Sequence, residues 1–138
     1  MFFNKKKSSE NNSYDLVKIA ALLIHAARID EKYSIEEEEI ISKTMLNLGA
    51  NENELATIIK KAKQSEKNTN QILDFTKEIK KLKEKDKIKI IRSLWRIVYS
   101  NKDADIYETN LMRRLSGLLY IDSKTMGDIK EQIKKENL

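Results

Sequence analysis

The feature that most restricts the fold of this chain is its lack of residues that interrupt a helix. Its 138 residues contain no proline and only three glycines, Gly49, Gly117 and Gly127. Strands and hairpins need proline or glycine at many of their turns, whereas the abundant leucine, isoleucine, alanine, lysine and glutamate favour helices. A chain of this length forms one domain around one core. We therefore expect a single compact all-α domain.

The chain has no cysteine, so disulfides, thiolate metal sites and cysteine catalysis are excluded. Its first residues, MFFNKKK, place charges after two apolar residues, whereas a signal peptide needs a longer apolar run. No segment approaches the roughly 18 apolar residues of a membrane-spanning helix. We therefore expect a cytoplasmic protein.

The net charge of +5 suggests nucleic acid as one class of partner. However, 22 lysines stand against five arginines, and proteins that read phosphates and bases usually favour arginine for its bidentate geometry. We interpret the excess of lysine as a general compositional bias rather than as a binding surface, so nucleic acid is not the expected partner.

The hydrophobic pattern predicts about seven helices. Residues 1–13 are polar without a period, and we expect a disordered arm there, with the helical domain over residues 14–138. Residues 16–29 are apolar at all but three positions, which is typical of a helix buried on all sides. A polar linker follows the third helix. The predicted helices are 15–29, 35–48, 51–63, 72–82, 86–99, one from residue 106 and one after residue 122.

The two parts of the chain resemble each other. Residues 15–55 and 86–126 align at a constant offset of 71 with six identities, among them Leu23 with Leu94. The predicted helix boundaries and loop lengths coincide as well. We interpret this as an internal duplication, which predicts two halves related by an approximate two-fold axis, with the first and fifth helices packed together at the centre.

Each half has a polar loop after its buried helix, at residues 30–34 and 101–105. Two tetrapeptides, Ser34 to Glu37 and Asp105 to Glu108, fit the capping box, in which the two side chains bond to free amides of the first helical turn. Under this interpretation the loops end helices and need no ligand.

The same loops also suggest a cation site. In the second loop, four oxygen-bearing side chains fall within eight residues: Asn101, Asp103, Asp105 and Glu108. Hard cations such as calcium and magnesium prefer such oxygen ligands. The loop is not an EF-hand, because it lacks the glycine and the glutamate required at the sixth and twelfth positions.

An alanine-rich helix, an acidic loop and a capped helix, repeated once, resemble the TerB family of tellurite-resistance proteins. The family's tandem motif is an aspartate and a glycine followed by a glutamate. Asp30 and Glu37 match the first copy, while Asn101 and Glu108 match the second with asparagine in place of the aspartate; a glutamate and a lysine replace the two glycines. Over residues 14–136 the resemblance implies an all-helical fold, a link to stress responses, divalent-metal binding through the acidic loops, and membrane-associated partners.

The remaining distinctive residues have structural interpretations. His25, the only histidine, is expected to be a hydrogen-bonded residue at the edge of the core, because no nucleophile elbow or glycine-rich oxyanion loop accompanies it. Trp95 shares a helical face with apolar residues, so we expect it in the core rather than in an aromatic binding surface. The lysines between residues 77 and 89 are expected on a solvated face.

Three functions remain open. The first is a non-enzymatic, TerB-like, stress-associated domain that binds a divalent cation weakly through Asp30, Glu37 and the second-loop residues. The second is a metal-free module that binds a protein partner near a membrane complex. A basic nucleic-acid binder is the third, and least favoured, alternative. Protein partners, no small-molecule substrate and no enzymatic activity are expected.

Overall fold

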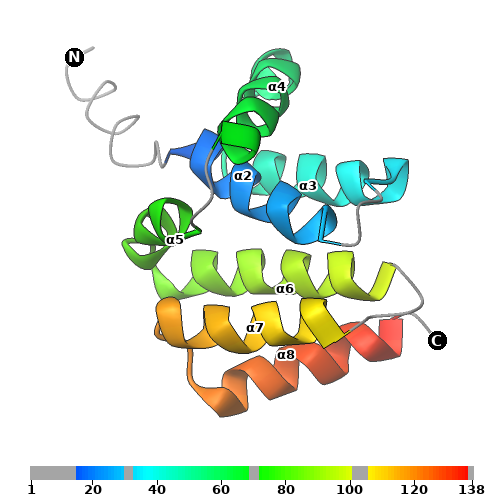
Figure 1. Cartoon of the computed structure of the whole chain (residues 1–138), viewed down its shortest axis with the longest axis vertical. Helices are drawn as coiled ribbons and strands as arrows, with labels where there is room; N and C mark the ends of the chain where they lie inside the picture. Colours follow the sequence, from blue (N-terminus) through cyan, green and yellow to red (C-terminus); the bar gives the residue numbers. More distant parts are fainter. Residues whose placement is uncertain (1–14, 30–32, 69–71, 101–105, 137–138) are drawn as a thin grey trace.

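The computed structural model describes residues 15–29, 33–68, 72–100 and 106–136, without the side chains of residues 106–109. Within these ranges the chain forms seven helices and no strand, so the all-α prediction is confirmed (Figure 1). The helices are α2 (Leu16–Ala27), α3 (Ile35–Asn47), α4 (Glu52–Asn68), α5 (Leu73–Lys80), α6 (Glu84–Ser100), α7 (Ile106–Leu118) and α8 (Ser123–Glu136). The expected arm at residues 1–13 lies outside the described residues.

Helix α2 lies at the centre of the fold, in contact with α3, α4, α5 and α6. Every residue from Ile19 to Ile24 is fully buried, as the apolar run predicted. Its first turn is capped by Asp15, whose side chain accepts a hydrogen bond from the amide of Lys18 at 3.2 Å. A helix buried on all faces makes most of its stabilising contacts through tertiary packing. None of the described helices has the length and apolar character needed to cross a membrane.

Helix α6 is the second central element, in contact with α2, α3, α7 and α8 (Figure 1). The predicted contact between α2 and α6 is therefore confirmed. Leu23 and Leu94, which the repeat alignment pairs, are both fully buried. Helix α2 packs against the two helices expected from its half, and α6 packs against α7 and α8. The two-fold relation between the halves stays a prediction.

The two positions that end α3 and α7 adopt the same backbone turn. The amide of Gly49 and the amide after it bond back to carbonyls in the last turn of α3, and Gly49 has a φ of 108°. Tyr120 and the amide after it make the same two bonds after α7, with a φ of 57°. Both turns are Schellman motifs, which need a left-handed residue. The glycine stop predicted at residue 49 is confirmed, and its counterpart 71 residues later carries a tyrosine.

Helix α4 is longer than predicted. The segment 64–70 reads as a polar linker, but α4 continues to Asn68. Glu66 stabilises this longer helix, because its carboxylate forms hydrogen bonds with His25 and Arg28 at the end of α2. A tertiary contact that depends on two distant residues thus outweighs the polar character of the segment.

One lysine of the segment 77–89 was assigned to the wrong environment. Lys87 is only 9% exposed, and its Nζ donates to the backbone oxygen of Leu119 at 3.3 Å. That oxygen belongs to the C-terminal end of α7, where unpaired carbonyls and the helix dipole favour a cation. The lysines at 77, 80, 81, 83 and 85 are exposed as predicted, and Lys89 is half-exposed.

Candidate functional site

The first acidic loop leads into a complete capping box. The hydroxyl of Ser34 accepts a hydrogen bond from the amide of Glu37 at 3.1 Å, and Oε1 of Glu37 accepts one from the amide of Ser34 at 2.8 Å. Glu37 is 3% exposed. The capping interpretation is confirmed for this loop, because each side chain satisfies one of the free amides at the start of α3.

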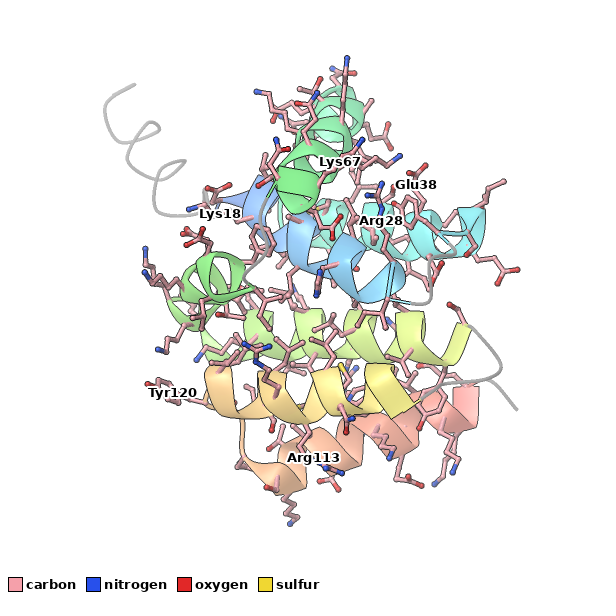
Figure 2. The ribbon with its side chains drawn as sticks, in the orientation of Figure 1. Lys18, Arg28, Glu38, Lys67, Arg113 and Tyr120 are labelled. Carbon is pink, nitrogen blue, oxygen red and sulfur yellow. The ribbon has the colours of Figure 1, made fainter. Side chains whose placement is uncertain are left out.

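Cationic side chains surround the end of the same loop. The guanidinium of Arg28 and the ammonium of Lys63 lie 5.8 and 5.2 Å from the centre of the Tyr33 ring. The Tyr33 hydroxyl donates to Oε1 of Glu38 at 3.1 Å, and Lys63 binds the same oxygen at 2.8 Å. Figure 2 shows Arg28 and Glu38 close together beside α2. Each cationic side chain at this end of the loop is held by a carboxylate, Lys63 by Glu38 and Arg28 by Glu66.

The pKa values of this cluster follow from its contacts. Burial, and then the Glu38 carboxylate, raise the pKa of Tyr33 well above its ordinary value, so the phenol stays protonated and donates. The hydrogen bond from Lys63 lowers the pKa of Glu38, and the one from Tyr33 acts in the same direction. Glu38 is therefore ionised at neutral pH and is already bound by two donors.

The other predicted ligands cannot be placed beside Glu37. Asp30 and three residues of the second loop, Asn101, Asp103 and Asp105, lie outside the described residues, and so does the side chain of Glu108. Among the side chains that the structure does describe, no three histidine, aspartate or glutamate residues gather into a metal-binding group. The predicted set of cation ligands stays a prediction.

The only histidine is part of a contact between α2 and α4. His25 Nδ1 lies 3.2 Å from one carboxylate oxygen of Glu66, and Arg28 donates to the other at 3.1 Å. All three side chains are partly buried, with 13% exposure for the Glu66 side chain. The prediction of a hydrogen-bonded histidine at the edge of the core is confirmed. Its partner was missed because Glu66 lies in a segment that reads as a linker.

The aromatic residues of α6 belong to the core. Trp95 is 4% exposed, and its ring stacks on Tyr99 with centroids 5.9 Å apart. The ammonium of Lys130, from α8, lies 5.4 Å from the Trp95 ring centre and covers it from outside. The prediction that Trp95 lies in the core is therefore confirmed. The side chain of Tyr107 is not among those that the structure describes.

A feature that the sequence interpretation missed is a groove of about 560 Å³ between α3 and α6. From α3 it is lined by Ile40, Lys43, Thr44 and Asn47. From α6 it is lined by Lys89, Arg92, Ser93 and Arg96. Each set has the spacing i, i+3, i+4 and i+7, which places its members on one helical face.

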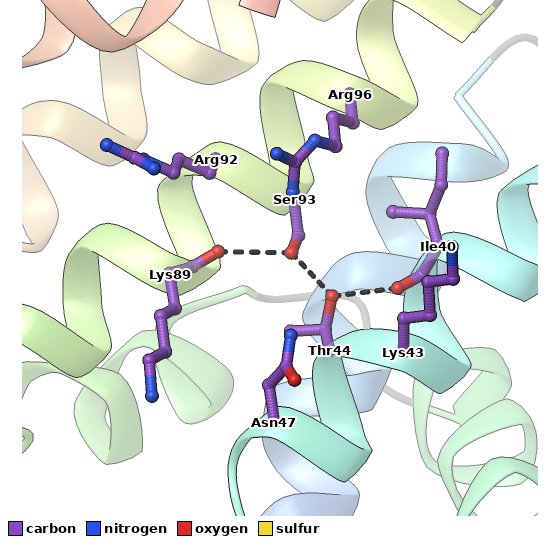
Figure 3. Close-up of a pocket in the computed structure, with 8 residues that line it drawn as sticks. All are labelled: Ile40, Lys43, Thr44, Asn47, Lys89, Arg92, Ser93 and Arg96. Carbon is purple, nitrogen blue, oxygen red and sulfur yellow. Dashed lines mark hydrogen bonds between the residues drawn. The ribbon is translucent and has the colours of Figure 1, made fainter.

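The floor of this groove is a pair of hydroxyl groups. Thr44 and Ser93 are 4% and 3% exposed, and their hydroxyls are hydrogen-bonded to each other where α3 meets α6 (Figure 3). Each hydroxyl also contacts a carbonyl oxygen of its own helix, at 2.8 Å from Thr44 and 3.0 Å from Ser93. The two hydroxyls have one proton each for these three contacts, so one of the three oxygen pairs carries no proton at any moment.

Comparison with known protein families gives a match over most of the chain. A family model described as "Tellurite resistance protein TerB" matches residues 16–131, which is most of the chain. Neither the curated proteins nor the solved structures include a match to this sequence. The matched segment begins at the first residue of α2 and ends inside α8, so it includes both acidic loops and the groove between α3 and α6.

Proposed function

Because the chain belongs to the TerB family, we propose that it is a non-enzymatic, stress-associated cytoplasmic domain, and that its second acidic loop binds a divalent cation weakly. The observation that favours the second loop over the first is the capping box of the first loop. Glu37, the motif glutamate of that loop, is buried and bound to the amide of Ser34. The first loop thus has a complete structural role for its glutamate without an ion.

The charges around the two loops favour the second one. Arg28 and Lys63 flank Tyr33 at the end of the first loop, and they already occupy the carboxylates of Glu66 and Glu38, which are therefore not free to bind a dication. The second loop and its following turn supply three carboxylates and one amide within residues 101–108. Calcium and magnesium bind such oxygen ligands, and neither needs a histidine or cysteine.

The absence of catalysis is part of the same proposal. His25 is the only histidine of the sequence, and histidine is the most common general base in enzymes. It is paired with Glu66, which also holds Arg28. This arrangement supports a role for the histidine in joining α2 to α4.

Thermal unfolding in the presence of metal ions tests the cation site. A ligand that binds the native state alone, at about one hundred times its dissociation constant, adds about 2.7 kcal/mol. For a domain of this size the melting temperature should rise by about 10 °C. Calcium, magnesium, manganese and zinc should be titrated separately against the full chain, and we expect a response to calcium or magnesium at millimolar concentration.

Two variants assign the response to a loop. The double variant Asp103→Asn/Asp105→Ser should lose the ion-dependent shift but keep its metal-free stability, because serine can still cap α7. The matched variant Asp30→Asn, in the first loop, should retain the full shift. A shift that disappears in Asp30→Asn, or a wild-type chain that responds to no ion, would contradict the proposal.

A second candidate function is a metal-free module that binds a protein partner near a membrane complex. It is favoured by the fact that Asp105 and Glu108 can form the same capping box that Ser34 and Glu37 form. If no ion stabilises the chain, affinity purification of the full chain from native membranes and cytosol tests this alternative. Nucleic-acid binding, the least favoured alternative, would instead show a steep loss of affinity as salt rises.

A further inference from the structure

The groove between α3 and α6 concentrates positive charge in a part of the protein that the proposed function does not use. Four of its lining side chains are cationic: Lys43, Lys89, Arg92 and Arg96. The chain has only five arginines, and two of them line this groove at adjacent turns of α6. Arginine presents a planar fork of donors that matches the oxygens of phosphate and carboxylate groups.

The partners of these cations leave a surplus of positive charge. Lys89 lies 3.6 Å from Asp86, and Arg96 forms two hydrogen bonds of 3.2 Å with Glu136. Arg92 donates to the neutral amide of Gln132 at 3.2 Å. Lys43 makes no ion pair within the described part of the chain. Within the described residues, two of the four cations thus form no direct ion pair, although Arg92 acts on the Glu136 carboxylate from a longer distance.

The pair between Arg96 and Glu136 shows that an acidic group already fits this place. Its two bonds have the fork geometry of arginine with a carboxylate, and Arg96 lowers the pKa of Glu136. Glu136 is the last residue of α8, and its side chain is 50% exposed. Exposed ion pairs are weak, so an external anion can compete with this internal one.

The surroundings limit the size of the anion. An adjoining cavity of about 440 Å³ continues the groove past Lys43 and Arg96, and it is lined by Glu36 and Glu39 as well as Glu136. These carboxylates repel an extended polyanion such as a nucleic-acid strand. The cationic stretch also has a single apolar lining residue, Ile40, whereas peptide ligands are usually anchored by apolar side chains. A compact anion fits the charge pattern best.

We propose that the groove between α3 and α6 binds the phosphate group of a small soluble compound. Arg92 on α6 and Lys43 on α3 supply positive charge from the two walls of the groove, Asn47 is a neutral donor on the α3 wall, and the hydroxyls of Thr44 and Ser93 form the polar floor between the walls (Figure 3). Glu136 acts as an internal competitor that holds Arg96 when no ligand is bound. The described residues that line the groove include none of the predicted cation ligands, so this site goes beyond the proposed cation binding.

Titration of the full chain with pyrophosphate and with inorganic phosphate, at constant ionic strength, tests the proposal. Amide resonances followed by NMR should shift around residues 43–47 and 89–96, with saturation in the millimolar range or below. Arg92→Gln should weaken pyrophosphate binding about tenfold or more, because it removes a charge-assisted contact. Glu136→Gln should tighten it about two- to fivefold, because the competing carboxylate is gone.

Lys61→Gln is the matched control, because Lys61 is exposed on α4 and has the same charge as the groove cations. It should leave the affinity within about twofold of the wild type, and thermal unfolding should show that all variants are folded. Equal weakening by Lys61→Gln and Arg92→Gln would mean non-specific attraction and would overturn the site. Resonance shifts spread over all lysine-bearing surfaces would do so too.

Two further arms test the source of the phosphate. Vesicles that contain phosphatidic acid should bind no better than pyrophosphate, and an acidic peptide without phosphate should not shift the groove resonances. Binding to the vesicles or to the peptide, together with no response to pyrophosphate, would overturn the proposal of a small soluble ligand. An unchanged or lower affinity in Glu136→Gln would refute the role of Glu136 as a competitor.

Discussion

Truncation of Leu23 to alanine probes the packing of the central helix. Leu23 is fully buried in α2, and α2 is surrounded by α3, α4, α5 and α6. The change removes three carbon atoms, which at about 0.8 kcal/mol for each buried methylene lowers the free energy of unfolding by about 2.4 kcal/mol. Helices on several sides restrict collapse into the space, and each 50 Å³ of remaining cavity costs about 1.2 kcal/mol more. We expect a total loss of about 3 to 4 kcal/mol.

Urea unfolding followed by circular dichroism measures this loss, with the slope of the transition expected to stay that of the wild type. Leu46→Ala is the matched control, since Leu46 is 36% exposed on the neighbouring α3 and loses the same three carbons. It should cost less than about 1 kcal/mol. A loss below about 1 kcal/mol for Leu23→Ala, or equal losses in the two variants, would refute the central position of α2.

Two further predictions concern charged residues. Lys87→Met keeps the length of the buried side chain but removes the donor to Leu119, so the free energy of unfolding should fall by about 1 to 2 kcal/mol. The control Lys85→Met, at an exposed position, should lower it by less than about 0.5 kcal/mol. Equal effects of the two changes on the urea midpoint would contradict the buried contact. The lowered pKa of Glu38 predicts a stabilising contribution that is present above its ordinary pKa of 4.5 and is lost as the pH falls through the lower value of the folded state. Urea midpoints measured below pH 4.5 should therefore fall less steeply in Glu38→Gln than in the wild type, and parallel profiles would argue against the contact with Lys63.

Local signals were sufficient for most of the helices. The capping signal at Ser34 and the glycine at residue 49 placed both ends of α3 to within one residue. Both signals act through backbone groups a few residues away, so they can be read without the rest of the fold. The end of α4 could not be found in this way, because Glu66 extends the helix through contacts with α2, about forty residues earlier in the chain.

The candidate sites also differ in whether local sequence was enough to predict them. The capping role of Glu37 was predictable because it depends on its own helix, whereas the predicted ligands Asp30, Asn101, Asp103 and Asp105 lie outside the described residues and stay a prediction. The groove between α3 and α6 was missed because it depends on which two helices meet. The one signal that could have found it is the pair of arginines, one turn apart on α6, in a chain that otherwise uses lysine.

The sequence by itself determined the fold class, the seven helices of the described residues, the burial of α2 and the capping of α3. These properties follow from composition and from spacings within a few residues, which fix how each helix presents its apolar face. Only the tertiary structure decided that Lys87 is buried against the end of α7, that Glu66 joins α4 to α2, and that the cations of α3 and α6 face one groove. The physical reason is that charge and hydrogen-bonding groups act over a few ångströms in space, and packing brings together groups far apart in the chain.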